Sequence, residues 1–161
     1  MTPVLSGRTA LITGAGAGIG EGIARRFAEE GAHVVVAELD EESGRSVAAS
    51  VDGLYVPMDA ADRASVENAV AEAIASYGSI DILVNNAWGG GALGRVEHKT
   101  DAQLTGALAV GYMGPFWAMR AAHADMKDRG WGRIINMCSL NGVNAHIGTL
   151  EYNAAKEALR A

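Results

Sequence analysis

Short apolar runs and longer amphipathic segments alternate along the whole chain. The apolar runs have the continuous hydrophobic character of strands covered on both faces, and they occupy residues 10–13, 33–37, 54–58, 80–84 and 132–138. Helical spacing or small residues between the runs predict helices at residues 19–31, 40–50, 62–77, 100–127 and from about 152 onward. This alternation predicts an α/β fold with a doubly wound parallel sheet, because right-handed crossovers place helices on both faces.

Single residues refine these elements. Pro57 lacks the N–H that a sheet ladder needs, so the third strand is expected at an edge. Asp62 is the expected N-cap of the third helix, and Gly78 is its expected end. A bend is predicted in the long fourth helix at Gly111, Gly114 and Pro115.

The composition restricts the class of protein. The 161 residues suffice for one domain with a real core, and 49% of them are hydrophobic. The net charge is −6 with dispersed Lys and Arg, which argues against a nucleic-acid partner. The chain has a single cysteine, Cys138, and residues 1–7 show no signal pattern. No apolar run approaches the ~20 residues that cross a bilayer. These features predict a cytoplasmic protein without a membrane partner. The four histidines are not spaced as ligands, so no metal is expected.

A glycine-rich turn, Thr13-Gly14-Ala15-Gly16-Ala17-Gly18-Ile19-Gly20, follows the first strand. A tight loop before a helix N-terminus presents unsatisfied N–H groups and the positive end of the helix dipole, which suit a phosphate. Gly14 would allow the sharp turn, Gly18 would let a pyrophosphate approach the backbone, and Gly20 would let the helix pack close to the strand. Glycines also serve ordinary turns, so this loop alone is a weak signal.

Polar residues follow three further strands. Glu38 ends the second strand about 20 residues after the glycine loop, where a carboxylate accepts hydrogen bonds from an adenosine ribose and repels a 2′-phosphate, favouring NAD over NADP. Asp59 follows the third strand and is placed to contact an adenine amino group, although an ordinary turn aspartate explains it nearly as well. Asn85 and Asn86 close the fourth strand at the edge where ligands bind, with turn residues as the simpler alternative.

Ser139, Tyr152 and Lys156 form a second constellation. Tyr152 and Lys156 are four residues apart, so they share one face of a helix. A lysine ammonium near a phenol favours its ionised form, which makes Tyr152 a workable acid or base near neutral pH. Ser139 follows the fifth strand and is placed to hydrogen-bond a substrate oxygen as charge develops on it. In isolation, a packed tyrosine beside a solvated lysine is the more common origin of this spacing.

Taken in order, four motifs of this chain resemble those of the short-chain dehydrogenase/reductase family. They are Thr13-Gly14-x-x-x-Gly18-x-Gly20, Asn85-Asn86-Ala87, Ser139 and Tyr152-x-x-x-Lys156. The interval of thirteen residues between Ser139 and Tyr152 matches that family too, and the resemblance covers essentially the whole chain. It implies a single Rossmann-like, dinucleotide-binding domain over residues 1–161 and hydride transfer between NAD and a secondary alcohol or ketone.

The resemblance also implies the role of each site residue. Tyr152 is the implied proton donor or acceptor, Ser139 orients and polarises the substrate oxygen, and Lys156 assists Tyr152 and binds the nicotinamide ribose. The implied NAD site consists of Gly14, Gly18, Ile19, Gly20, Glu38, Asp59, Ala60, Asn86, Ala87, Tyr152 and Lys156. Relatives commonly pair through the long helix and the tyrosine-bearing helix, so a homo-oligomer, a dimer or a tetramer, is expected.

Three departures from the family pattern stand out. Trp88 replaces the glycine that usually completes an Asn-Asn-Ala-Gly motif, and Gly111 stands where the family usually has a catalytic asparagine that anchors a proton-relaying water. Family members run to roughly 250 residues, so this domain is expected to be incomplete at the C-terminus and to lack two further strands. The expected consequences are an open edge strand and a short last helix held only by Tyr152, Ala155 and Leu159 on the sheet.

Two functions follow from the sequence. The first is an NAD-dependent oxidoreductase that acts on a small-molecule alcohol or ketone. The second is a non-catalytic NAD-binding fragment or interaction module of the same family, favoured by Gly111 and by the early end of the chain. A methyltransferase of similar topology is disfavoured, because it would not need Ser139, Tyr152 and Lys156 together.

Overall fold

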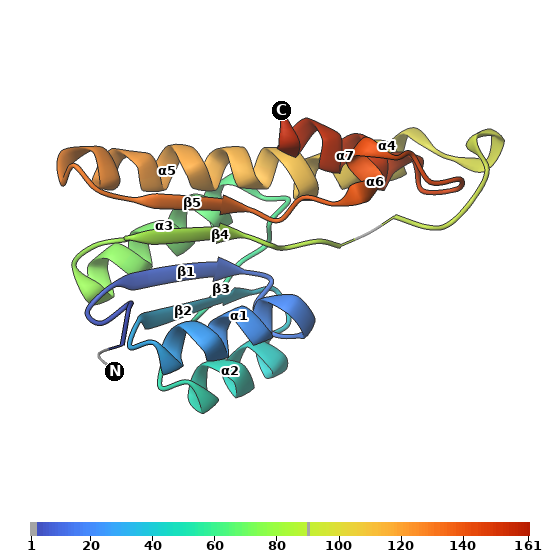
Figure 1. Ribbon diagram of the computed structural model, residues 1–161. Helices are drawn as coiled ribbons and strands as arrows, with labels where there is room; N and C mark the ends of the chain where they lie inside the picture. Colours follow the sequence, from blue (N-terminus) through green and yellow to red (C-terminus); the bar gives the residue numbers. More distant parts are fainter. Residues whose placement is uncertain (1–2, 90) are drawn as a thin grey trace.

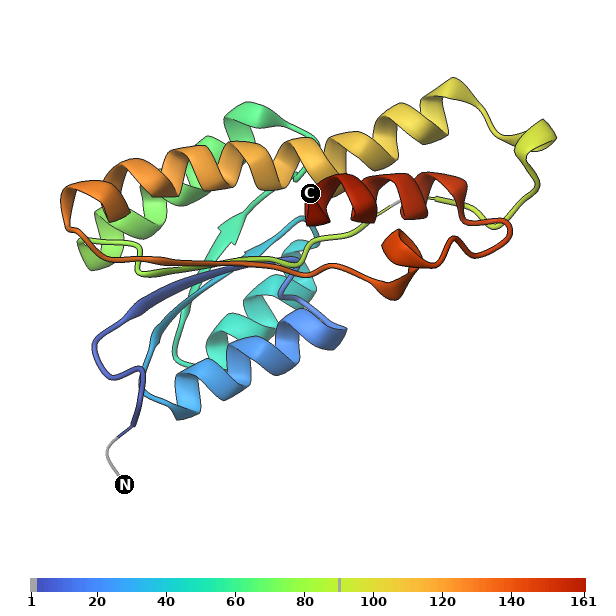
Figure 2. The ribbon, with the colours of Figure 1, turned by 45° about the horizontal axis from the view of Figure 1, so that its top comes forward.

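The fold is a parallel sheet between two layers of helices (Figures 1 and 2). The computed structural model describes residues 3–89 and 91–161. Within these ranges five strands pair in the order β3-β2-β1-β4-β5, with the bounds β1 Thr9–Thr13, β2 His33–Glu38, β3 Leu54–Pro57, β4 Ile82–Asn85 and β5 Arg133–Asn136. The predicted doubly wound, Rossmann-like α/β fold is therefore confirmed.

Helices cover both faces of the sheet. Their bounds are α1 Gly18–Glu29, α2 Glu41–Ser50, α3 Arg63–Tyr77, the 3₁₀ turn η1 Val96–His98, α4 Asp101–Leu108, the π turn η2 Ala109–Met113, α5 Gly114–Asp128, α6 Leu140–Val143 and α7 Leu150–Arg160. Along β1, Ala10 and Ile12 enter the core beneath α1 and α2, whereas Leu11 enters the core beneath α3 and α5. Both faces of the central strand are thus buried, which is why β1 is continuously apolar. The outer strand β5 is mostly exposed. No helix in the described ranges combines the length and apolar character needed to cross a bilayer.

The strand order reverses beside β1. The chain proceeds from β1 to β2 and β3 on one side, and then crosses to β4 and β5 on the other. At such a reversal a crevice forms outside the carboxyl ends of the strands, because neighbouring connections leave in opposite directions. The segments after β1, β2 and β4 therefore converge at one edge of the sheet.

Three local predictions are confirmed. Pro57 ends β3, which is an outer strand of the sheet. The Asp62 carboxylate caps α3 by accepting a hydrogen bond of 2.9 Å from the Ser65 N–H. Gly78 ends that helix with a φ of +80°. The other outer strand is β5.

The long helix is interrupted at its middle. It consists of α4, the π turn η2 and α5. The predicted distortion near Gly111, Gly114 and Pro115 is confirmed, but it takes the form of a π turn rather than a simple bend. Gly111 is buried within this turn, and π turns within α-helices are frequent at functional sites.

The segment after β5 departs from the prediction. The sequence predicts no helix between residue 138 and about residue 152, but residues 140–143 form α6, and α7 begins at Leu150 rather than near Tyr152. Ala155 and Leu159 are buried as expected. The surface that α7 meets is nevertheless helical, because α6, α4 and η2 pack against it in place of the sheet (Figure 2).

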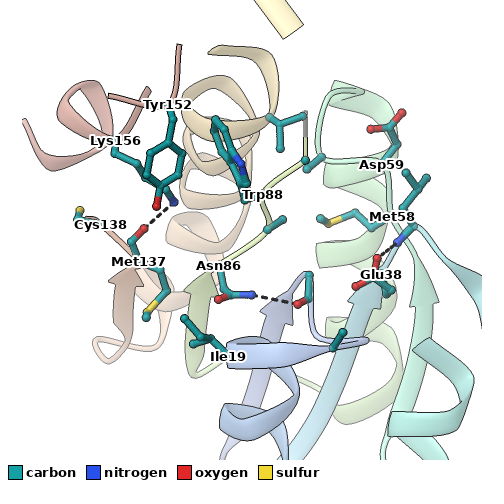
Figure 3. A pocket seen from close by; sticks show the side chains of 17 residues that line it. Ile19, Glu38, Met58, Asp59, Asn86, Trp88, Met137, Cys138, Tyr152 and Lys156 are labelled. Atoms are coloured by element: carbon teal, nitrogen blue, oxygen red, sulfur yellow. Dashed lines mark hydrogen bonds between the residues drawn. The ribbon is translucent and has the colours of Figure 1, made fainter. Parts of the chain in front are cut away.

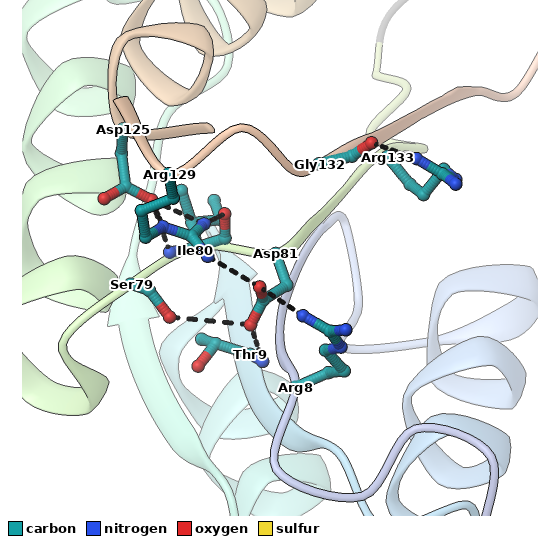
Figure 4. A network of polar contacts seen from close by, with 9 residues as sticks. All are labelled: Arg8, Thr9, Ser79, Ile80, Asp81, Asp125, Arg129, Gly132 and Arg133. Carbon is teal, nitrogen blue, oxygen red and sulfur yellow. Dashed lines mark hydrogen bonds and ion pairs between the residues drawn. The ribbon is translucent and has the colours of Figure 1, made fainter. Parts of the chain in front are cut away.

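A buried carboxylate fastens the amino ends of the central strands (Figure 4). Asp81 directly precedes β4 and is 2% exposed. Its oxygens accept hydrogen bonds from the Thr9 N–H at 2.9 Å, from Arg129 at 2.8 Å and from Arg8 at 3.2 Å. Burial alone would raise the pKa of Asp81, but the bonds from Thr9 and Arg129 and the guanidinium charges outweigh it and hold this pKa below its usual value.

We expect Asp81→Asn to lower the free energy of unfolding by about 2–4 kcal/mol, because two partly exposed arginines then face a neutral group in place of a buried carboxylate. The pKa of Asp81 is lower in the folded protein than in the unfolded chain. The contribution of the ionised Asp81 carboxylate to the free energy of unfolding is therefore complete above the unfolded pKa of about 4, and it is lost as the pH falls through the pKa of the folded protein. Denaturant unfolding at neutral and at acidic pH measures both effects, and the variant should lose less stability on acidification than the wild type.

Glu72→Gln, on the exposed side of α3, is the control for removing one carboxylate charge. Equal stability of Asp81→Asn and wild type at neutral pH would show that the network does not hold the strands together.

Candidate active site

A cavity of about 450 Å³ opens at the carboxyl ends of the strands, at the crevice that the topology predicts (Figure 3). It runs from Glu38 and Asp59 at one end to Tyr152 and Lys156 at the other. Of the predicted site residues, nine line it: Gly14, Ile19, Glu38, Asp59, Ala60, Asn86, Ala87, Tyr152 and Lys156. The lining also includes residues outside the predicted set of site residues, namely Ala17, Leu39, Met58, Trp88, Gly89, Val110, Met137 and Cys138.

The glycine loop brings the backbones of β1, α1 and the end of β4 closer than side chains allow. Gly14 has a φ of +64°, and a Cβ there would lie 2.7 Å from the Ala87 Cα. A Cβ on Gly20 would collide with the Gly14 carbonyl oxygen. Gly18 begins α1 with open space around it, and no side chain of the described residues caps this helix. The uncapped N–H groups and the helix dipole therefore suit an anionic group.

Glu38 is anchored to the glycine loop. Its Oε2 accepts a hydrogen bond of 2.9 Å from the Gly16 N–H, and its Oε1 accepts bonds from the N–H groups of Leu39 at 2.8 Å and Asp40 at 3.3 Å. A Cβ on Gly16 would lie 2.7 Å from the Glu38 Cγ, so only glycine admits the carboxylate here. Gly16 was not among the predicted site residues, and its position two residues after Gly14 was the only available signal.

Asn86 fastens the end of β4 to the end of β1. Its Nδ2 donates to the carbonyl oxygens of Thr13 and Gly14, both at 3.0 Å. The N–H groups of Asn86 and Ala87 donate to the Thr13 Oγ1, also at 3.0 Å. Asn85 was expected at the crevice beside Asn86, but it belongs to β4, is buried and bonds to an asparagine of β5. Alternation along a strand turns neighbouring side chains to opposite faces.

Asp59 and Ala60 line the cavity after β3. The Asp59 Oδ1 accepts a hydrogen bond of 2.8 Å from the Ala61 N–H, and the Asp59 N–H donates to the Ser65 Oγ at 2.9 Å. Asp59 thus serves as a turn residue, the alternative left open by the sequence, and faces the cavity as well. α5 approaches this turn closely, because a Cβ on Gly114 would collide with the Ala60 carbonyl oxygen.

Tyr152 and Lys156 project from α7 into the other end of the cavity (Figure 3). Lys156 is 4% exposed, and its Nζ donates a hydrogen bond of 2.7 Å to the Met137 carbonyl oxygen. Burial lowers the pKa of Lys156 from its usual value, because the charged form loses hydration. The ammonium nitrogen lies 5.8 Å from the centre of the Tyr152 ring. The arrangement places the Lys156 side-chain nitrogen beside a phenol at the cavity wall.

Trp88 stands next to this pair. Its ring meets the Tyr152 ring edge to face, with centroids 4.7 Å apart and planes at 78°. The indole also lies against the π turn, where a Cβ on Gly111 would be 2.7 Å from the Trp88 Cζ3. The two departures at positions 88 and 111 are therefore one contact, which their separation along the sequence concealed.

Ser139 occupies a different setting from the one expected. It is the N-cap of α6, and its Oγ accepts a hydrogen bond of 3.2 Å from the Asn141 N–H. Its neighbour Cys138 lines the cavity, but Ser139 is not among the lining residues. The role of Ser139 toward a substrate oxygen stays a prediction. The capping role was hidden because four residues of helix carry no periodic signal.

A buried ion pair holds α7 against the loop after Trp88. The Glu151 Oε1 accepts hydrogen bonds from the Lys99 Nζ at 2.8 Å and from the Ala92 N–H at 2.9 Å. The side chains of Lys99 and Glu151 are 4% and 1% exposed. The bond from Lys99 holds the pKa of Glu151 below its usual value against the opposing effect of burial. This pair fixes the start of the helix that carries Tyr152.

Known proteins with related sequences and folds include several dehydrogenases. A family model described as short chain dehydrogenase matches residues 8–161. A 2,5-dichloro-2,5-cyclohexadiene-1,4-diol dehydrogenase from Sphingobium indicum is 37% identical over 97% of this chain and 64% of its own length. A sorbitol dehydrogenase from Cereibacter sphaeroides is 36% identical over 96% of this chain and 61% of its own length.

The crystal structure of an NAD⁺-bound xylitol dehydrogenase matches with a TM-score of 0.93 and 28% identity, over 97% of this chain and 62% of that one. The chain therefore spans slightly less than two thirds of the length of these relatives.

We expect Lys99→Met to lower the free energy of unfolding by about 3–5 kcal/mol, because it leaves the Glu151 carboxylate buried without its cation. The double variant Lys99→Met/Glu151→Leu should recover much of that loss, since an apolar pair often replaces a buried ion pair without cost. Denaturant unfolding measures both variants, and hydrogen exchange should show faster opening of α7 in the single variant.

The pKa of Glu151 is lower in the folded protein than in the unfolded chain. The stabilisation of the fold by the ionised Glu151 is therefore present above the unfolded pKa of about 4.3, and it is lost as the pH falls through the pKa of the folded protein. Lys127→Met, at an exposed position of α5, controls for the loss of a lysine. Unchanged stability and exchange in Lys99→Met would rule out a holding role for the pair.

Proposed function

The chain belongs to the short-chain dehydrogenase family, and from this membership and its site we propose that it is an NAD-dependent oxidoreductase that interconverts a secondary alcohol and a ketone. One observation carries the proposal: Tyr152 and Lys156 share one cavity with the glycine loop and Glu38. The relatives support the substrate class, because the names of three of them specify a cyclic diol, sorbitol and xylitol.

The residues of the cavity fit NAD. At the glycine loop, missing side chains and the uncapped start of α1 leave room and N–H donors for a pyrophosphate. At the end of β2, the Glu38 carboxylate would accept a hydrogen bond from a ribose hydroxyl and repel a 2′-phosphate. When bound, NAD supplies the acceptor or donor of a hydride. The remaining residues proposed to contact it are Ile19, Asp59, Ala60, Asn86 and Ala87.

Tyr152 is the proposed acid and base. As a phenolate it would accept the hydroxyl proton of an alcohol, and as a phenol it would return a proton to the oxygen of a ketone. Lys156 would stabilise the phenolate and donate to a ribose hydroxyl with the N–H groups that Met137 does not use. Ser139 caps α6 as an acceptor from the Asn141 N–H, so its own O–H would remain available to donate a hydrogen bond to the substrate oxygen.

We further propose that residues 1–161 act as one dinucleotide-binding domain of a homo-oligomer, a dimer or a tetramer. Leu108, Tyr112 and Phe116 recur at every fourth position from the end of α4 into α5 and are 36%, 40% and 40% exposed. An apolar stripe of this kind on the outer face of a helix is typical of a surface that packs against another subunit.

We expect Tyr152→Phe to reduce turnover by about 10²–10⁴-fold, because it removes the proton that the reaction transfers. NADH affinity should stay nearly unchanged, since the ring remains in place. Steady-state kinetics over a panel of alcohols and ketones, with NADH fluorescence titration, separates the two effects. Tyr77→Phe, at the end of α3, is the matched control.

Turnover of Tyr152→Phe at the wild-type rate would sink the assignment of Tyr152. NADH binding by the unmodified protein without turnover of any substrate in the panel would favour the alternative, an NAD-binding module without chemistry.

We expect Glu38→Ala to weaken NAD binding by roughly 10–100-fold, the usual effect of losing a hydrogen bond to a charged group. Affinity for NADP should rise relative to NAD, because the repulsion of the 2′-phosphate disappears. Fluorescence titrations with NADH and NADPH measure the ratio, and Glu42→Ala on the exposed side of α2 is the control. Equal affinity of the unmodified protein for both cofactors would contradict the role of Glu38.

A further inference from the structure

We propose that Trp88 is a positioning residue for Lys156: its indole face stabilises the buried ammonium beside Tyr152, and the missing side chain at Gly111 is what lets the indole reach that place. The inference deepens the proposed function, because it concerns how the same site keeps its lysine charged. It is nevertheless testable on the free protein.

The Lys156 ammonium is short of conventional partners. Its residue is 4% exposed, and the Met137 carbonyl is the hydrogen-bond acceptor that the described residues give it. None of the ion pairs among the described residues includes Lys156. Burying a charge without a counter-ion is costly, so another source of stabilisation is needed.

Aromatic rings supply that stabilisation on the cavity side. The Lys156 Nζ lies 5.6 Å from the centre of the Trp88 ring and 5.8 Å from the centre of the Tyr152 ring. Both distances fall within the range over which a cation is attracted to the negative face of a ring, and tryptophan is the strongest of the aromatic partners. Trp88 is therefore the principal ring partner of the ammonium.

Gly111 sets the position of the indole. A Cβ at Gly111 would lie 2.7 Å from the Trp88 Cζ3 and 2.9 Å from the Ala155 Cβ. These contacts are too short to tolerate, so a side chain at position 111 would push the indole away from α7. The edge-to-face contact with Tyr152 holds the ring from the other side.

Few titratable groups compete with this interaction. The exposed Cys138 thiol, from the segment after β5, would raise the pKa of Lys156 when ionised. On α7 the centre of the Tyr152 ring lies 5.8 Å from the Lys156 Nζ, and the charged groups Glu157 and Arg160 pair with each other at 2.6 Å. The residues of α6 include none, and those of η2 include only Tyr112, which is 40% exposed.

The test is a titration of Lys156 in protein labelled with ¹³C at the lysine ε-carbon. The chain has three lysines, Lys99, Lys127 and Lys156, and the signal absent from Lys156→Met identifies the third. In Trp88→Leu, which keeps an apolar side chain without a ring face, we expect the titration midpoint of Lys156 to fall by about 0.5–1 pH unit. Trp88→Phe should restore part of the difference.

Gly111→Ala tests the second half of the proposal. It should lower the same midpoint by displacing the indole, whereas Gly106→Ala, with no atom within 4 Å of the added Cβ, should leave it unchanged. An unchanged or higher midpoint in folded Trp88→Leu would overturn the proposal, and an unchanged midpoint in folded Gly111→Ala would overturn the role of Gly111. Circular dichroism establishes that each variant is folded.

These titrations need neither cofactor nor turnover. A protein that fails to oxidise alcohols but shows the expected midpoint shifts would refute the proposed function and leave the role of Trp88 standing. The reverse outcome, turnover without any shift in Trp88→Leu, would refute the role of Trp88 alone.

Discussion

The close approach of backbones where β1, α1 and the end of β4 meet is the constraint on which the rest of the site depends. Gly14 and Gly20 have no room for a Cβ, and the Thr13 hydroxyl and the Asn86 amide bind the two strand ends together across this junction. The cavity exists because these strands end together while their connections diverge. At the amino ends of β1 and β4, the Asp81 network keeps the two strands in register. Polar contacts thus fix these central strands at both of their ends.

The two ends of the cavity are built on different principles. The Glu38 end is formed by backbone turns directly after strands of the sheet, and its geometry follows from the strand order. The Tyr152 end is carried by α7, which touches the sheet layer little and packs on α6, α4 and η2. Its position relies on side-chain contacts, namely the Lys99–Glu151 ion pair and the packing of Trp88.

This difference explains which parts of the fold and of the site could be predicted from the sequence. The alternation of strands and helices, the edge position of Pro57 and the cap at Asp62 follow from periodicity and local hydrogen bonding, and they were predictable. So was the gathering of Glu38, Asp59 and Asn86, because the carboxyl ends of parallel strands meet at one edge. The seat of α7 was not predictable, since it depends on contacts between residues far apart in the sequence. Asn85 and Ser139 show the same limit, since each lies next to a residue that lines the cavity. The Asn85 side chain is instead buried and bonds to β5, and the Ser139 side chain caps α6.

The bonds of Glu38 to the backbone have a consequence for recognition. A carboxylate offers about four acceptor positions, and three are filled by the N–H groups of Gly16, Leu39 and Asp40. The side chain is thus held in its rotamer before any ligand arrives, and the conformational entropy of ordering it is lost during folding rather than during association. The one remaining acceptor position, on Oε2, then acts as a rigid directional probe, so recognition at this end of the cavity depends on where a hydroxyl points as much as on its presence.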